Sequence, residues 1–234
     1  MSTLYDSLPF NMYCEFDAPF REGTGTITQD VSKNHSVVDL KNTPTWSSLD
    51  TGLGYLTFAV ASSQYAESDA AVTGNLDFTT GDYSLAAWIN ITDNTLTQII
   101  MGRYELNVSG WELYWLNVGG NRYMTLRHHH AGGTATRSAC YSLGWTESVW
   151  TFCGISRTGG GDQVHYRNGV EVDVVGNSAL EDPETETRDL VIGARYSKDT
   201  NFYNGGLWRP RCWSTALTAD DWLTIYELEK GWFA

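Results

Sequence analysis

The alternation of apolar and polar side chains predicts β-strands along most of this chain. Residues 83–91, YSLAAWINI, are the clearest example, because every second side chain of a strand points to the same face. One face of this strand would carry Leu85, Ala87, Ile89 and Ile91. Trp88 falls on the other face, beside Ala86. The segment is therefore predicted to be a strand with apolar side chains on both faces.

Turn signals divide the rest of the chain into further short strands. Val118-Gly-Gly-Asn121 separates residues 111–117 from residues 123–130 and predicts a hairpin. A second hairpin is predicted where TGGGD, residues 158–162, separates residues 149–157 from residues 163–168. Other strands are predicted at residues 13–16, 24–34, 54–60, 98–103, 170–175, 190–195 and 207–213. Residues 64–66 are expected to pair with residues 54–60.

One helix is expected near the C-terminus, at residues 218–229. Thr218 is suited to cap its N-terminus, and Asp221 is favourable in the first turn. Trp222 and Ile225 then recur at helical spacing. The chain is thus predicted to end in a short amphipathic helix.

Composition agrees with a single folded domain. Hydrophobic residues make up 41% of the 234 residues, which is enough for a substantial core, and charged residues only 18%. The 23 glycines and 5 prolines suit many strands joined by glycine-containing turns. We therefore predict an all-β fold, a two-sheet antiparallel β-sandwich that spans residues 1–234 as one domain. Residues 1–12 would form an irregular N-terminal arm.

The net charge of −13 limits the partners that the chain is expected to bind. Such a surface repels phosphate backbones, so no nucleic-acid binding is expected. No apolar run approaches the length of a membrane-spanning helix, and the N-terminal residues lack the basic and apolar regions of a secretory signal peptide. These features predict a protein of the virion, or one that is extracellular after lysis, and otherwise a cytoplasmic protein.

The four cysteines have no metal-binding spacing; they are Cys14, Cys140, Cys153 and Cys212. Buried free thiols are the favoured interpretation. A disulfide between Cys14 and Cys140 remains an alternative.

Several segments, in order along the chain, resemble the concanavalin A-like lectin/glucanase superfamily in its laminin-G-like form. The segments are residues 30–34 (DVSKN), 84–90 (SLAAWIN), 110–117 (GWELYWLN), 149–172 and 190–222. The resemblance covers about residues 13–228 and implies a jelly roll of two antiparallel sheets. It also implies a range of functions, from glycan binding and protein binding to β-glucan hydrolysis and structural roles in surface assemblies.

The resemblance further implies a structural calcium site, from which this chain departs. Trp208 and Arg209 stand where relatives carry an Asp-Glu pair, and neither supplies the oxygen ligands that calcium prefers. Asp17 and Asp30 are the remaining candidate calcium ligands. Trp208 instead becomes a candidate contact residue. Pro210 lacks an N–H and predicts that its strand is bulged or lies at a sheet edge.

Catalytic motifs are incomplete in this sequence. Glucanases of this fold carry Glu-x-Asp-x-x-Glu on one strand, where two of the carboxylates flank the glycosidic bond. The nearest match begins at Glu171 and Asp173 but has Gly176 where the acid/base would stand. The chain is therefore expected not to be an enzyme, and a glycoside hydrolase is kept only as a further alternative.

Three consecutive histidines form another candidate site. His128 and His130 would share one strand face, and His165 lies on another predicted strand, so three imidazoles could bind zinc or copper. The favoured alternative is a strand end whose polar rings face water beside a glycine-containing loop.

The aromatic surplus of 10 Trp and 13 Tyr offers a candidate ligand-binding surface. Trp111 and Trp115 share one strand face, and Tyr123, Arg127 and His129 share one face of the next strand. If these faces adjoin, they form a platform on which sugars stack, with Arg and His as hydrogen-bond donors. The alternative is that both tryptophans point into the core.

Two functions are consistent with such a domain. The first is a virion structural component, either a capsid decoration or a tail-associated protein, expected from the single domain, the missing export signal and the missing catalytic motif. The second is a free carbohydrate-binding, lectin-like module. The expected partners are glycans or other virion or surface proteins, and the chain is a possible homo-oligomer.

Overall fold

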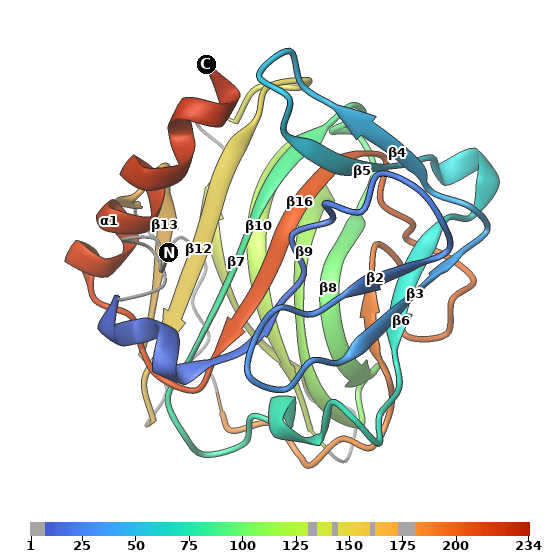
Figure 1. Cartoon of the computed structure of the whole chain (residues 1–234). Coiled ribbons are helices and arrows are strands. Elements are labelled where there is room, and N and C mark those ends of the chain that lie inside the picture. The colour runs from blue at the N-terminus through green and yellow to red at the C-terminus, as the bar shows by residue number, and fades with distance from the viewer. Residues whose placement is uncertain (1–7, 131–134, 142–144, 160–161, 173–180) are drawn as a thin grey trace.

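Two antiparallel sheets of eight strands each lie face to face in the computed structural model (Figure 1). It describes residues 8–130, 135–141, 145–159, 162–172 and 181–234. Sheet A has the order β14-β13-β12-β7-β16-β5-β4, and β1 also pairs with β16. Sheet B has the order β11-β10-β9-β8-β15-β6-β3-β2. The predicted two-sheet antiparallel sandwich is confirmed.

The strands range from three residues in β2 to ten residues in β9. Those of sheet A are β1 (Cys14–Asp17), β4 (Thr45–Ser48), β5 (Gly54–Phe58), β7 (Tyr83–Ile91), β12 (Thr151–Arg157), β13 (Gln163–Arg167), β14 (Val170–Val172) and β16 (Gly205–Trp213). Those of sheet B are β2 (Ile27–Gln29), β3 (Val37–Lys41), β6 (Tyr65–Ser68), β8 (Gln98–Glu105), β9 (Ser109–Val118), β10 (Asn121–His129), β11 (Ala135–Tyr141) and β15 (Leu190–Ile192). The helical elements are η2 (Pro9–Tyr13), η3 (Val60–Ser62), η4 (Gly74–Leu76), α1 (Ala219–Glu229) and η5 (Lys230–Phe233).

The main core fills the space between the two sheets. On β7 the predicted alternation is confirmed, because Leu85, Ala87, Ile89 and Ile91 all lie in this core. Trp88 points the other way, into a second apolar layer on the outer face of sheet A. Strand β7 is therefore apolar on both faces because each face is covered.

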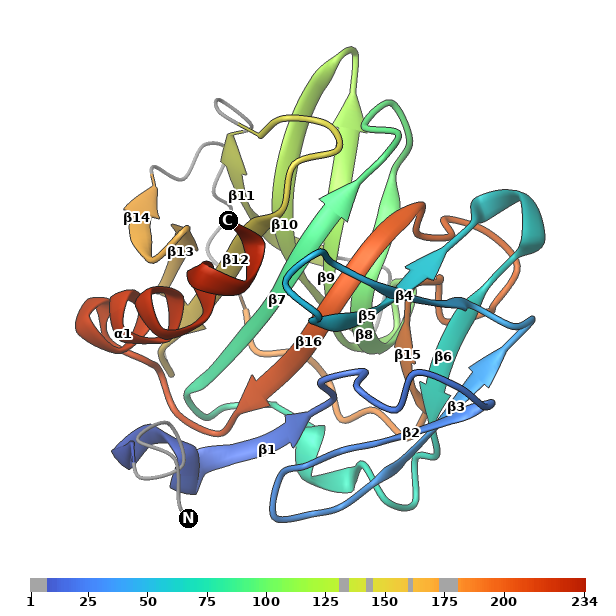
Figure 2. The ribbon, with the colours of Figure 1, turned by 45° about the horizontal axis from the view of Figure 1, so that its top comes forward.

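The C-terminal helix α1 supplies the cover of sheet A (Figure 2). Thr218 caps it as predicted, in a capping box with Asp221. Trp222 is fully buried against Phe152 and Tyr166, which belong to β12 and β13. Helix η5 continues the chain past α1, so the helical conformation extends through Gly231. None of the described helices is long and apolar enough to cross a membrane.

Some pairings differ from the sequence-based prediction. Residues 64–66 were expected beside β5, but β6 pairs with β3 and β15 in the other sheet. The strand expected at residues 24–34 shrinks to β2, and β3, β4 and β11 were not predicted. Strands β2, β3 and β4 have only three to five residues, so local propensity carries little information about them.

Strand β16 is bulged and lies inside sheet A. Its register to β7 shifts between Trp208 and Arg211, and Arg209 has a φ of 55°. On one side of β16, residues 205–207 pair with β5 and residues 211–213 pair with β1. Pro210 lies between these two stretches, so its missing N–H removes no hydrogen bond from either pairing. The predicted bulge is confirmed, and the alternative of a sheet edge is wrong.

The described cysteines Cys14, Cys153 and Cys212 are free and buried. The alternative of a disulfide between Cys14 and Cys140 is therefore wrong. Burial raises the pKa of the Cys14 and Cys212 thiols far above their usual range, so both stay protonated.

Candidate ligand-binding face of sheet B

Helix α1, the one α-helix among the described residues, covers sheet A and leaves the outer face of sheet B without such a layer. Register decides which side chains reach this face. On β9 and β10, Arg127 lies opposite Glu112, and Thr125 lies opposite Tyr114, so these four side chains share one face. They point away from the main core. This outer face is the candidate binding surface.

The expected platform of tryptophans is not formed, because Trp111 and Trp115 point to the opposite face of β9. Each is 1% exposed within the main core. The indole N–H of Trp111 donates to the Leu76 carbonyl at 2.9 Å, and that of Trp115 donates to the Asn94 carbonyl at 3.3 Å. The alternative in which both rings belong to the core is the one that the structure adopts.

The other predicted contact residues are divided between the two sheets. Tyr123, Arg127 and His129 lie on the outer face of sheet B, although His129 is fully buried there. Trp208 lies on sheet A, where the ring of Phe233 covers it with 5.5 Å between centroids. Trp208 is only 5% exposed and packs under the C-terminus rather than forming an open contact surface.

A buried carboxylate organises the centre of the outer face. Glu112 is 2% exposed, and its Oε1 lies 3.2 Å from Arg127 Nη1 and 3.1 Å from His129 Nε2. The backbone N–H of Asn107 donates to His129 Nδ1 at 3.0 Å, which leaves the proton of the neutral ring on Nε2 to face the carboxylate. Glu112 is thus held by two partners on neighbouring β10.

Arg127 connects this carboxylate to the surface. Its guanidinium lies 4.5 Å from the centre of the Tyr114 ring and also donates to the Tyr114 hydroxyl. Burial works to lower the pKa of Arg127, but the Glu112 carboxylate together with Tyr114 and Tyr104 holds the pKa above its ordinary value. Arg127 is therefore a fixed cation.

Tyr104 of β8 completes the floor of the site. Its ring stacks on His129 with 4.9 Å between centroids and 13° between planes. Gly102 makes this possible, because a Cβ there would lie 2.8 Å from the Tyr104 ring. Burial raises the pKa of Tyr104 well above its usual range, so its hydroxyl stays neutral. Tyr104, Tyr114, Glu112 and His129 together form a rigid, buried floor.

A pocket of about 190 Å³ opens above this floor. Its lining consists of Thr97, Ile99, Tyr104, Leu106, Glu112, Tyr114, Arg127, Arg195 and Asn201. The partly exposed members carry mostly hydrogen-bond donors: two guanidinium groups, an amide and a hydroxyl. The rim of the pocket is therefore suited to a ligand rich in oxygen.

A second, more polar pocket of about 380 Å³ lies beside the first. Tyr196 lines it, whereas the preceding residue, Arg195, lines the first pocket. The Tyr196 ring meets the Tyr104 ring edge-on at 5.3 Å between centroids. The two pockets thus adjoin, and a ligand longer than one unit would extend from one into the other.

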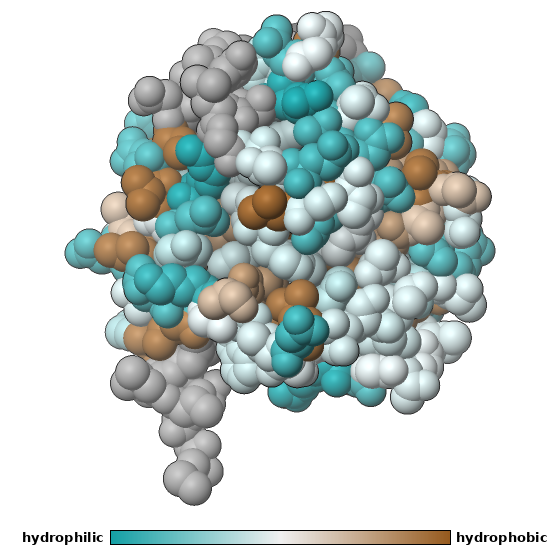
Figure 3. Space-filling view, turned by 90° about the horizontal axis from the view of Figure 1, so that it is seen from above, coloured by the Kyte–Doolittle hydropathy of each residue, from teal (hydrophilic) through white to brown (hydrophobic). Residues whose placement is uncertain are grey.

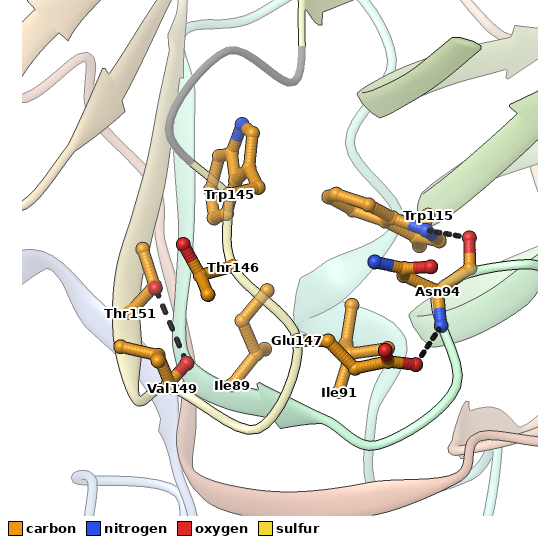
Figure 4. Close-up of a pocket in the computed structure, with 9 residues that line it drawn as sticks. All are labelled: Ile89, Ile91, Asn94, Trp115, Trp145, Thr146, Glu147, Val149 and Thr151. Atoms are coloured by element: carbon orange, nitrogen blue, oxygen red, sulfur yellow. Dashed lines mark hydrogen bonds between the residues drawn. The ribbon is translucent and has the colours of Figure 1, made fainter. Parts of the chain in front are cut away.

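A third hollow lies between the sheets at the end of the sandwich (Figure 4). Trp115 and Trp145 meet edge-on across it at 5.6 Å, and Glu147 accepts from the Asn94 backbone N–H at 3.1 Å. Its volume is about 10 Å³, which is room for about one water molecule.

The surface seen in Figure 3 mixes hydrophobic and hydrophilic residues among those coloured, so no apolar patch marks a partner there.

The predicted calcium ligands are both occupied by protein groups. Arg209 forms a two-pronged ion pair with Asp17, with Nε to Oδ1 at 2.9 Å and Nη2 to Oδ2 at 2.8 Å. Asp30 accepts from the backbone N–H groups of Asp17 at 2.9 Å, Ser32 at 2.8 Å and Ser36 at 3.2 Å. Burial raises the pKa of Asp30, against the effect of these donors. These residues do not fit calcium, because a cationic guanidinium already neutralises Asp17.

The remaining catalytic and metal candidates do not assemble into a site. Among the described residues, no group of three His, Cys, Asp or Glu side chains could hold a metal ion. His128, His130 and His165 are all buried rather than facing water, which corrects the favoured interpretation of this segment. Glu171 is exposed on β14, and Asp173 and Gly176 lie outside the described residues.

Sequence reasoning missed the residues at the centre of the site, namely Tyr104, Glu112, Tyr114, Arg195 and Asn201. A signal was present in WELYWLN, where one alternating set is Trp-Leu-Trp and the other is Glu-Tyr-Leu. The set with the carboxylate is the one that faces outward. Nothing local indicated Arg195, whose place follows from the pairing of β15 with β8.

Residues 63–221, more than half of the chain, match the family described as the concanavalin A-like lectin/glucanases superfamily. No curated protein matches the chain in sequence. The receptor-binding domain of botulinum neurotoxin mosaic serotype C/D is similar in structure, with a TM-score of 0.70 and 16% identity over 94% of this chain and 52% of that chain. The binding domain of Paraclostridial Mosquitocidal Protein 1 has a TM-score of 0.67 and 12% identity over 93% and 52%.

A botulinum neurotoxin DC binding domain, solved in complex with rat synaptotagmin II, is also similar, with a TM-score of 0.64 and 14% identity over 94% of this chain and 52% of that chain. This chain spans about half the length of these solved structures. Identities this low establish a shared fold and nothing finer. The family match and the lectin-like sandwich agree: the chain belongs to the concanavalin A-like lectin/glucanase superfamily.

Proposed function

We propose that this chain is a non-catalytic carbohydrate-binding module that holds glycans on the outer face of sheet B. The observation that carries the proposal is the pocket of about 190 Å³ above the buried floor of Tyr104, Glu112 and Tyr114. Its rim offers guanidinium, amide and hydroxyl groups, which pair with sugar hydroxyls. The similar solved structures are themselves binding domains, which supports a recognition role for this sandwich.

Catalysis is not part of the proposal, although the superfamily also includes glucanases. Glycoside hydrolysis by two carboxyl groups needs them about 5–5.5 Å apart for retention, or about 6.5–9.5 Å apart for inversion. Among the described residues that line the pocket, Glu112 is the one carboxylate. Arg127 holds it in an ion pair and His129 in a hydrogen bond, which suits a structural role rather than proton transfer.

Glycan binding and a blocked pocket test this function. Leu106 lies at the rim, in the turn between β8 and β9, so Leu106→Trp would fill the opening. We expect the wild-type protein to bind a subset of glycans on an array and Leu106→Trp to weaken that binding at least about tenfold. Leu223→Trp is the matched control, because Leu223 is exposed on α1, which covers the other sheet. Silence of the wild type on the array, or equal binding by both variants, would contradict the proposal.

The role of virion component expected from the sequence stays a prediction. It is compatible with a glycan-binding face, since a surface module of a particle also needs a ligand. Capsid or tail genes beside the coding sequence, or co-purification of the protein with particles, would support it. Isolation of the protein free of any particle from cells that produce such particles would count against it.

A further inference from the structure

Most of the charged side chains that the structure describes on the outer face of sheet B are paired with one another. Arg127 is paired with Glu112, and Arg188 donates to Glu105 at 3.0 Å. Lys198 lies 3.0 Å from Asp189 and also contacts Glu67. These pairs neutralise both walls of the second pocket and the floor of the first.

Among the side chains that the structure describes on this face, Arg195 is the exception. Within the part of the chain that the structure describes, its guanidinium forms no ion pair and donates no hydrogen bond. Its contact is with the Tyr196 ring, whose centre lies 5.5 Å from the guanidinium carbon. The chain carries 28 acidic against 15 basic residues, so an unpaired cation in a pocket is not explained by a shortage of carboxylates.

The backbone holds Arg195 at this place. Its N–H donates to the Thr200 carbonyl at 3.1 Å, and its carbonyl accepts from the Lys198 N–H at 2.8 Å. This turn directly follows β15, which is anchored to β8 and β6. This turn therefore fixes the backbone of Arg195 beside the pocket, so binding a ligand has to order only its side chain.

A guanidinium that lacks a protein partner has a specific chemical preference. Its five N–H donors form a planar fork that matches a carboxylate with two parallel hydrogen bonds. In the same pocket, Thr97 and Asn201 offer neutral groups suited to hydroxyls, while Glu112 already neutralises the charge of Arg127. The pocket thus combines one free site for an anion with several sites for neutral oxygens.

We propose that the glycan recognised on this face is acidic, and that Arg195 binds the carboxylate of a uronic or sialic acid residue. This inference rests on the proposed function, since it specifies the ligand of the same pocket. The ring of the acidic sugar would occupy the first pocket, and the rest of the glycan would pass over Tyr196 into the second. Because the chain as a whole is acidic, selectivity for an anionic ligand depends on this local cation.

The test compares acidic glycans with their neutral counterparts. The array would carry uronic-acid oligosaccharides beside the same compounds with reduced carboxyl groups, and sialyllactose beside lactose and 6′-sulfated lactose. We expect carboxylated glycans to bind at least about tenfold more tightly than their neutral counterparts. Equal binding would overturn the acidic ligand while leaving the proposed function in place, whereas a silent array would remove both. Tighter binding of sulfated lactose than of sialyllactose would overturn the assignment to a carboxylate.

Variants of Arg195 then locate the effect, by calorimetric titration with the tightest glycan and its neutral counterpart. Arg195→Gln should lower the affinity for the acidic glycan at least about tenfold and leave the affinity for the neutral glycan within about twofold of the wild-type value. Arg195→Lys should recover part of the loss, because it keeps the charge without the planar fork. Arg21→Gln is the matched control, since Arg21 is exposed beside Gly54 of sheet A. An unchanged preference in Arg195→Gln, with circular dichroism identical to wild type, would overturn the inference.

Discussion

His128 and His165 are enclosed in protein, and each keeps its ring neutral. Burial lowers the pKa of both side chains to about 3. For His128 the neutral form also fits its partners, because Nδ1 lies 2.7 Å from the Glu181 carbonyl and Nε2 contacts the Tyr83 hydroxyl. Each ring therefore stabilises the fold only while it carries no charge.

The pH dependence of stability follows from this burial. Below the ordinary histidine pKa of about 6.5, the unfolded chain binds protons that the folded chain does not, so stability falls as pH falls toward about 3. The full contribution is present above about pH 6.5. Between pH 7.5 and pH 5.0, we expect each buried histidine to remove about 2 kcal/mol from the free energy of unfolding. Urea unfolding at both pH values should show that the free energy of unfolding of His165→Gln decreases by about 2 kcal/mol less than that of the wild type.

His35→Asn serves as the control for this measurement. His35 is exposed and has a φ of 50°, which Asn tolerates. Its unfolding free energy should depend on pH as the wild type does. If His165→Gln kept the full wild-type loss between the two pH values, the buried neutral ring would not be the cause.

Helix α1 shows how one element is fixed to a sheet by close approach and by charge. The Trp222 ring lies against Gly154 of β12, where an added Cβ would be 2.7 Å from the indole. The Trp222 indole N–H also donates to Ser156 Oγ at 2.8 Å, so the ring has little freedom to move. At the far end of α1, Glu229 forms a two-pronged ion pair with buried Arg211 at 2.8 and 2.9 Å.

Gly154→Ala tests the close approach of α1 to sheet A. The added methyl group would push the Trp222 ring off its place, and overpacking of this kind costs about 1–3 kcal/mol. We expect urea unfolding to show a loss of that size, together with a change in tryptophan fluorescence of the folded state. Gly74→Ala is the matched control, because a Cβ at Gly74 meets nothing within 4 Å. Equal stability of the two variants would argue against a tightly packed helix.

At the scale of the whole molecule, the two sheets share one core. Residues from β1 near the N-terminus, from β7 in the middle and from β16 near the C-terminus all belong to it; they include Phe16, Leu85 and Cys212. The second layer then joins η2 to α1 through Phe10 and Trp222. Helix η2, the first described element, and helix α1 are therefore built into the same packed body.

This arrangement predicts that residues 1–234 unfold as one cooperative unit. Tryptophan fluorescence and far-ultraviolet circular dichroism should give the same midpoint in urea, since the tryptophans occupy both layers and the strands span them. Separate midpoints for the two signals would mean that α1 and its layer unfold independently of the sandwich.

More of the fold than of the candidate site could be predicted from the sequence. The alternation in residues 83–91 and the glycine turn at Gly119 are local signals, and each leads to the strand or hairpin that the structure contains. The ligand-binding residues depend on which face of β9 is outward. Trp111 and Glu112 are neighbours in sequence yet lie on opposite faces, and either set could have formed the core.

The sequence by itself determined most of the longer strands, the hairpin of β9 and β10, the capped C-terminal helix and the membership of the superfamily, because all of these follow from short-range alternation, turn chemistry and motif order. Only the tertiary structure decided the rest. Trp111 and Trp115 are buried in the core, and Asp17 forms an ion pair with Arg209. Arg195 lines the pocket that β8, β9 and β10 form. The physical reason is that these relations depend on pairing and burial between segments far apart in the chain, which local patterns do not encode.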